Sequence, residues 1–94
     1  MRVAIAEQVF AERVDDETVL LELEAGSYYG LDPVAARLWD LLGELGSIEA
    51  VAEVASGEYD VSLEQLTEDL NALVAELAER NLIVMEGHAA PSRR

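Results

Sequence analysis

The hydrophobic periodicity changes at Asp32, and this change constrains the fold more than any other feature. Residues 27–31 contain two adjacent tyrosines and a glycine, which is typical of a short strand. From residue 34 onward, apolar residues repeat at helical spacing. Asp32 can cap that helix, and Pro33 suits its first position, where the missing N–H costs nothing. A strand this short predicts a sheet edge, which can accept another chain.

Two more strands are predicted upstream, over residues 8–14 and 18–24. Alternate residues of the second segment form two faces, one with Val19, Leu21 and Leu23 and the other with Leu20, Glu22 and Glu24. That period of two indicates a half-buried strand. Turns at residues 15–17 and 25–26 would make a three-stranded antiparallel meander. Residues 1–10 are alternatively an irregular arm.

Three helices are predicted after the strands. The first ends at Gly43 to Gly46, and the second starts at Ser47 and closes at Ser56-Gly57. The third begins with a capping box, in which Ser62 and Gln65 satisfy reciprocal backbone donors, and ends at Asn81, which tolerates a left-handed cap. Residues 82–85 suit a last short strand. The fold class is therefore α+β and winged helix-turn-helix-like, with a three-stranded antiparallel sheet packed on three helices.

Charge limits the partners. The formal net charge is −14, from 20 acidic and 6 basic residues, and there is no lysine. Nucleic-acid binders neutralise phosphates with Lys and Arg, so we expect no nucleic acid and no anionic membrane surface as partner. We also expect no signal peptide or membrane span, and the lack of cysteine fits a cytoplasmic location.

Few residues of this chain could act as metal ligands or catalytic groups. His88 is the only histidine and falls in residues 87–94, which we expect to be a disordered tail, so we predict no metal and no cofactor. No nucleophile elbow, phosphate-binding loop or catalytic triad is present, so we predict no enzyme. Tyr28 and Tyr29 point to opposite strand faces, one toward the core and the other toward a surface or groove. Trp39 is expected in the core.

Three runs in order carry a resemblance to a known family: residues 19–23, then 26–33, then 36–42, with Val-Leu-Leu-Glu-Leu, Gly-Ser-Tyr-Tyr-Gly-Leu-Asp-Pro and Ala-Arg-Leu-Trp-Asp-Leu-Leu. Together they resemble the PqqD-like family, and residues 69–77 leading into 81–83 are similar to its last helix and exit. The family usually has glycine where Asn81 stands and often asparagine where Asp32 stands, and both substitutions preserve capping. The resemblance covers residues 8–86, so we expect one domain over residues 1–86.

Members of this family are RiPP recognition elements, which bind the leader segment of a ribosomally made precursor peptide. The resemblance implies that the leader pairs with the edge strand as an extra strand beside the last helix. It points to the stand-alone leader-binding proteins of lasso-peptide biosynthesis, with a leader peptidase and a cyclase as partners. Carried over residue by residue, the accepting strand is Ser27, Tyr28, Tyr29, Gly30 and Leu31. The opposite side of the groove is Leu66, Asp69, Leu70, Leu73, Glu76 and Leu77.

Other functions remain open at this point. A PqqD-type peptide chaperone of quinone-cofactor biosynthesis is the nearest alternative within the family. A winged-helix transcription regulator is a second, although the second and third predicted helices carry mainly Glu and Asp where DNA binding needs Lys and Arg. The leader sequence, the partner surface and the oligomeric state do not follow from the sequence.

Overall fold

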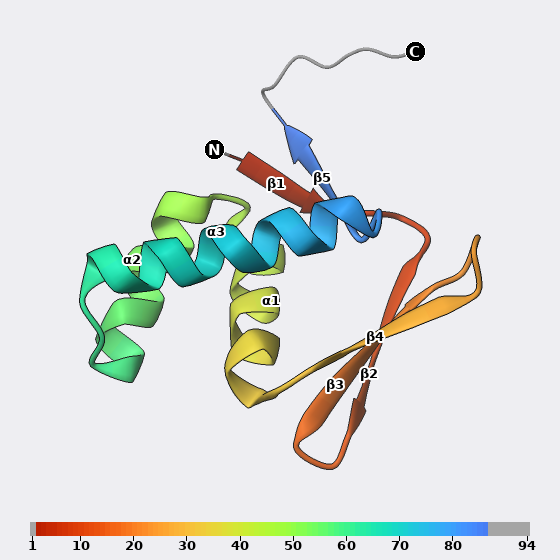
Figure 1. Cartoon of the computed structure of the whole chain (residues 1–94), viewed down its shortest axis with the longest axis horizontal. Coiled ribbons are helices and arrows are strands. Elements are labelled where there is room, and N and C mark those ends of the chain that lie inside the picture. The colour runs from red at the N-terminus through yellow and green to blue at the C-terminus, as the bar shows by residue number, and fades with distance from the viewer. Residues whose placement is uncertain (1, 87–94) are drawn as a thin grey trace.

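Strands and helices are segregated along the chain in the computed structural model, which describes residues 2–86 (Figure 1). The strands are β1 (Arg2–Ile5), β2 (Val9–Val14), β3 (Glu17–Glu22), β4 (Ser27–Leu31) and, after the helices, β5 (Ile83–Glu86). The helices are α1 (Pro33–Leu45), α2 (Ile48–Tyr59) and α3 (Leu63–Glu79). Over the described range, the predicted α+β fold with a three-stranded antiparallel sheet and three helices is confirmed. The predicted tail, with His88, lies outside that range.

The three-stranded sheet has the order β2-β3-β4 and extends away from the helices as an arm (Figure 1). Leu21 of β3 lies opposite Phe10 of β2 on one side and opposite Tyr28 of β4 on the other. Asp15 and Gly26 adopt left-handed conformations at the two hairpin turns, with φ of 57° and 72°. β4 is therefore an edge strand, as predicted.

The inner face of this sheet, which packs against α1, is not its more apolar face. In β3 it carries Thr18, Leu20 and Glu22, all buried, whereas Val19, Leu21 and Leu23 lie on the outer face. The position of Leu31 determines which face of the sheet packs inward. This residue is buried directly before α1 and pairs with Thr18, so the alternation of side chains turns the face of Thr18 inward.

A second sheet was not predicted. β1 pairs antiparallel with β5, with Val3 opposite Met85 and Ile5 opposite Ile83. The predicted last strand is confirmed, and the irregular arm considered for residues 1–10 is wrong, because β1 and β2 are both regular strands. The Val3 N–H also donates to the Gly46 carbonyl (3.0 Å), which ties β1 to the end of α1.

Most predicted helix ends are confirmed by their hydrogen bonds. Asp32 Oδ1 accepts from the Ala35 N–H (2.8 Å) with Pro33 at the start of α1. Asn81 has φ 63°, the left-handed conformation expected after α3. Gly46, at φ 66°, ends α1 and donates to the Leu42 carbonyl.

Two expectations about helix ends are wrong. α2 does not close at Ser56-Gly57 but continues to Tyr59 and ends at Asp60, whose φ is 55°. The capping box of α3 forms in one direction only. Ser62 Oγ accepts from the Gln65 N–H (3.1 Å), but the Gln65 side-chain amide donates to Asp69 Oδ1 (3.0 Å).

The hydrophobic core lies between the three helices, the β1-β5 sheet and the inner face of the arm. Trp39 is only 4% exposed and belongs to it, as predicted. Each fully buried leucine contributes about 1.5–3 kcal/mol relative to an exposed one. The largest side chains withdrawn completely from solvent are Leu20, Leu42, Leu70, Leu77, Leu82 and Val51.

Candidate functional site

The free edge of β4 is the first component of the site. β4 pairs with β3 along one side, and no other strand of the described chain pairs with it. Half of its backbone N–H and C=O groups therefore point away from the sheet, where they can pair with an added strand. Leu31, the last residue of β4, is only 2% exposed, so the accessible part of the edge is formed by the residues before it.

Gly30 in β4 is not required by the folded chain itself. Its φ is not left-handed, and a Cβ at this position would meet no atom within 4 Å. Neither strain nor crowding inside the molecule explains a glycine here. A side chain that is missing where space is open leaves room for a close partner backbone.

The two tyrosines have different surroundings. Tyr28 is 73% exposed on the outer face, whereas Tyr29 is half-buried on the inner face and packs against the core. The Arg80 guanidinium lies over the Tyr29 ring, with 4.8 Å from Cζ to the ring centroid. Burial raises the pKa of Tyr29, and the Glu76 carboxylate raises it further. Tyr29 therefore faces α3 and Tyr28 faces away from it.

A hollow of about 230 Å³ separates the start of β4 from the end of α3. It is lined by Ala25, Ser27, Tyr28, Tyr29, Arg80, Asn81 and Leu82. Ser27 and both tyrosines, predicted on one side of a groove, thus meet residues from the end of α3 in one place.

Three of the six α3 residues predicted to line the groove lie in the core. Leu66, Leu70 and Leu77 are at most 4% exposed, so they hold α3 in position and are inaccessible from outside. They belong to the buried face of the helix, which packs inward.

One accessible row on α3 flanks the buried face and is formed by Asp69, Leu73 and Glu76, with Arg80 directly after the helix; these four residues are called here the α3 stripe. Leu73 is half-buried, and the other three are exposed. Arg80 was missed as a site residue, although its position four residues after Glu76 puts both on one helix face. The two form an ion pair of 3.3 Å between Nη2 and Oε2.

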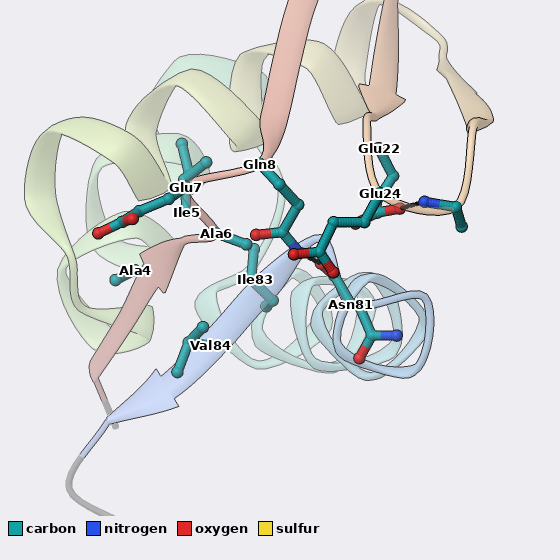
Figure 2. Close-up of a pocket in the computed structure, with 11 residues that line it drawn as sticks. Ala4, Ile5, Ala6, Glu7, Gln8, Glu22, Glu24, Asn81, Ile83 and Val84 are labelled. Carbon is teal, nitrogen blue, oxygen red and sulfur yellow. Dashed lines mark hydrogen bonds between the residues drawn. The ribbon is translucent and has the colours of Figure 1, made fainter.

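A larger hollow, of about 860 Å³, lies where the two sheets meet (Figure 2). Glu7, Glu22 and Glu24 line it, and Gln8 Nε2 donates to the Asn81 carbonyl (3.4 Å). The buried Glu22 is held by the Ala25 N–H, which donates to its Oε1 (2.6 Å). In residues 2–86, no cluster of His, Cys, Asp and Glu side chains is arranged to hold a metal ion. A third hollow, of about 560 Å³, lies beside α2, α3 and Met85.

Of the helices in the described chain, none has both the length and the apolar character needed to cross a bilayer.

Two solved structures are similar to this chain over nearly its whole length. One, described as "TbiB1 in Complex with the TbiA(beta) Leader Peptide", has 37% sequence identity and a TM-score of 0.81, over 93% of this chain and 99% of that one. The other, "Lasso peptide synthetase B1 complexed with the leader peptide", has 26% identity and a TM-score of 0.82, over 90% of this chain and 100% of that one. No curated protein matches the sequence.

The model of one protein family matches residues 17–83, which include β3, β4, all three helices and the first residue of β5. That family is described as coenzyme PQQ synthesis protein D (PqqD). The match spans more than half of the 94 residues and agrees with the structural similarity. The chain belongs to the PqqD family.

Proposed function

We propose that this protein binds the leader segment of a ribosomally synthesised precursor peptide in lasso-peptide biosynthesis, as an added strand on β4. The observation that carries the proposal is the similarity to two proteins whose solved structures contain a leader peptide. The free edge of β4 beside α3 supplies a place for such a peptide.

In strand addition, the backbone and the side chains contribute differently to the binding free energy. Backbone pairing with β4 is independent of the guest sequence and contributes about 1 kcal/mol net for each hydrogen bond. Ordering a flexible leader costs several kcal/mol, so buried side chains must supply much of the affinity. Alternate guest side chains would point toward the α3 stripe, where Leu73 offers an apolar contact and Asp69 and Glu76 accept hydrogen bonds or pair with basic groups.

The proposed contacts are the β4 residues Ser27, Tyr28, Tyr29 and Gly30 and the α3 stripe, while Leu31 anchors the end of β4 in the core. Leu66, Leu70 and Leu77 support these contacts from inside the core. We further propose that the bound leader is presented to a leader peptidase and then to a cyclase, while this protein itself carries out no reaction.

A second candidate is the quinone-cofactor branch of the family. The description of the matching family model, a coenzyme PQQ synthesis protein, favours it. The guest would then be the precursor peptide of that cofactor. Comparing the affinities for the two kinds of peptide separates the branches.

Backbone NMR of the full chain tests the proposal. The probe is a synthetic leader peptide of the precursor encoded beside this protein's gene, the TbiA(beta) leader peptide serves as a second probe, and a scrambled peptide is the control. We expect amide signals of β4 and of the α3 stripe to shift together and to saturate. Shifts confined to α1 and α2, or equal shifts with the scrambled peptide, contradict the proposal.

A further inference from the structure

The buried Glu22 carboxylate makes fewer hydrogen bonds than a buried acid usually does. Glu22 is 4% exposed, on the inner face of the arm. Its Oε1 accepts from the Ala25 N–H (2.6 Å), a bond that holds the β3-β4 turn. Within residues 2–86, Oε2 accepts no hydrogen bond, and no Arg, Lys or His forms an ion pair with Glu22. Acids this deeply buried are normally paired, so this carboxylate favours a positively charged group brought by a guest.

Glu22 lines the hollow of about 860 Å³ where the two sheets meet, called here the acidic hollow. Glu7 and Glu24 line it too, and no basic side chain of the described chain does. Figure 2 shows Gln8, Glu22 and Glu24 gathered at the Asn81 end of the hollow, while Glu7 points away from them. The charge at that end therefore selects for cations.

The rest of the acidic hollow is largely apolar. Val84 is 53% exposed there, next to the core residue Ile83 on β5. The apolar lining is formed by Ala4, Ile5, Ala6, Ala25, Ile83 and Val84. A Lys or Arg side chain suits both parts of the hollow, because it carries a charged head on an apolar stem.

The acidic hollow adjoins the proposed leader site. Glu22 pairs with Ser27, the first residue of β4. Ala25 and Asn81 line both the acidic hollow and the 230 Å³ hollow beside β4. A guest strand that runs along the β4 edge and continues past Ser27 therefore reaches the acidic hollow between these two residues. This step rests on the proposed function.

We propose that the acidic hollow receives a Lys or Arg side chain of the leader, whose charged head pairs with Glu22 and Glu24. The head donates to Glu22 Oε2, and the stem packs on Ile83 and Val84. Backbone pairing with β4 accepts many sequences, whereas a buried charge pair accepts only a basic residue at one position. The hollow thus selects leaders with a basic residue next to the segment that pairs with β4.

The test combines variants of the full chain with variants of the guest. Glu22→Gln removes the charge but keeps an oxygen that can accept from the Ala25 N–H, so the turn is retained. Glu17→Gln, at the other end of β3 and outside the hollow, changes the net charge equally and is the matched control. Thermal unfolding by circular dichroism checks folding. If Glu22→Gln unfolds, Glu24→Gln takes its place under the same criteria.

The probe is the synthetic leader peptide of the precursor encoded beside this protein's gene, with each Lys and Arg replaced by Gln in turn. Fluorescence anisotropy gives the affinity of every combination. We expect one leader position at which Gln weakens binding to wild type and to Glu17→Gln at least tenfold, but to Glu22→Gln less than twofold. Such non-additivity identifies groups in direct contact. By NMR, the Ala25 amide signal of wild type should shift with the native leader and much less with that Gln peptide.

The outcomes separate this proposal from the proposed function. Wild-type binding of the leader with no such position, or a leader without Lys or Arg, overturns the acidic hollow and leaves strand addition on β4 intact. Equal loss of the effect in Glu17→Gln also overturns it, because the attraction is then that of an acidic protein as a whole. No leader binding by wild type overturns both proposals.

Discussion

Arg37 of α1 and Glu58 in the last turn of α2 are joined by two hydrogen bonds, Nε to Oε1 at 3.0 Å and Nη2 to Oε2 at 2.8 Å. The pair attaches the end of α2 to α1. It lies beyond Ser56-Gly57, where the sequence favours the end of a helix. Bonding to the guanidinium lowers the pKa of the Glu58 carboxyl below its usual value of 4.5. Both side chains are more than a third exposed, so solvent weakens the pair.

Replacing Glu58 should open the last turn of α2 and leave the rest of the fold intact. We expect faster amide hydrogen exchange near residues 57–60 in Glu58→Gln, with little change at Trp39. Because the folded pKa of Glu58 is lowered, its contribution is present above pH 4.5 and is lost as the pH falls through the lowered value. The same local opening should therefore occur in acidified wild type. Glu53→Gln, on the same helix, is the control, and equal exchange in both variants contradicts the assignment.

Leu73 should contribute apolar contact to the bound leader. Leu73→Glu places a charge on the α3 stripe, and we expect at least tenfold weaker leader binding, which corresponds to about 1.4 kcal/mol. Asn71→Glu adds the same charge to the same helix, beside the 560 Å³ hollow on its other side, and should bind normally. Fluorescence anisotropy with a labelled leader measures both, and helical circular dichroism checks folding. Normal binding by Leu73→Glu excludes this part of α3 from the site.

Two glycines should respond oppositely to alanine. Gly30 has open space and an ordinary backbone, so Gly30→Ala should raise the free energy of unfolding by about 0.4–1 kcal/mol, because it restricts the unfolded chain. Gly26 has φ 72°, so Gly26→Ala should lower that free energy by about 1–2 kcal/mol. Urea unfolding measures both. A destabilised Gly30→Ala would show that the native fold constrains this position after all.

Stability should fall at alkaline pH through Tyr29. Burial raises its folded-state pKa above 10.0, so the folded protein holds the hydroxyl proton more tightly than the unfolded chain does. The contribution is fully present below pH 10.0 and is lost as the pH rises through the folded pKa. Tyr29→Phe has no such proton, so its urea-unfolding free energy should fall less over this range. Parallel pH profiles for the two proteins would argue against the shift.

The neighbours of Tyr29 on α3 should move its pKa in opposite directions. The Glu76 carboxylate raises the pKa and the Arg80 guanidinium lowers it. We therefore expect a lower Tyr29 pKa in Glu76→Gln and a higher one in Arg80→Gln, read from the ring resonances in an NMR titration. If both variants shift the pKa the same way, the two side chains do not face Tyr29 as described.

The junction between β4 and α1 depends on residues that are close in sequence, so the sequence alone was sufficient to predict it. Asp32 caps the helix through Ala35, three residues away, and Pro33 carries its preference in its own ring. The left-handed Asn81 after α3 is equally local. The free edge of β4 also followed from composition, because a short strand with a glycine suits an edge.

Tertiary contacts decided which faces are buried. Either face of β3 could have packed inward, and the pairing of Leu31 with Thr18 selected the less apolar one. The same applies to α3, where the sequence did not determine how far burial extends around the helix. Packing enclosed Leu66, Leu70 and Leu77 and left Leu73 only half-buried. Hydrogen bonds near in sequence therefore determined where elements begin and end, whereas contacts between distant residues determined which side chains a partner can reach.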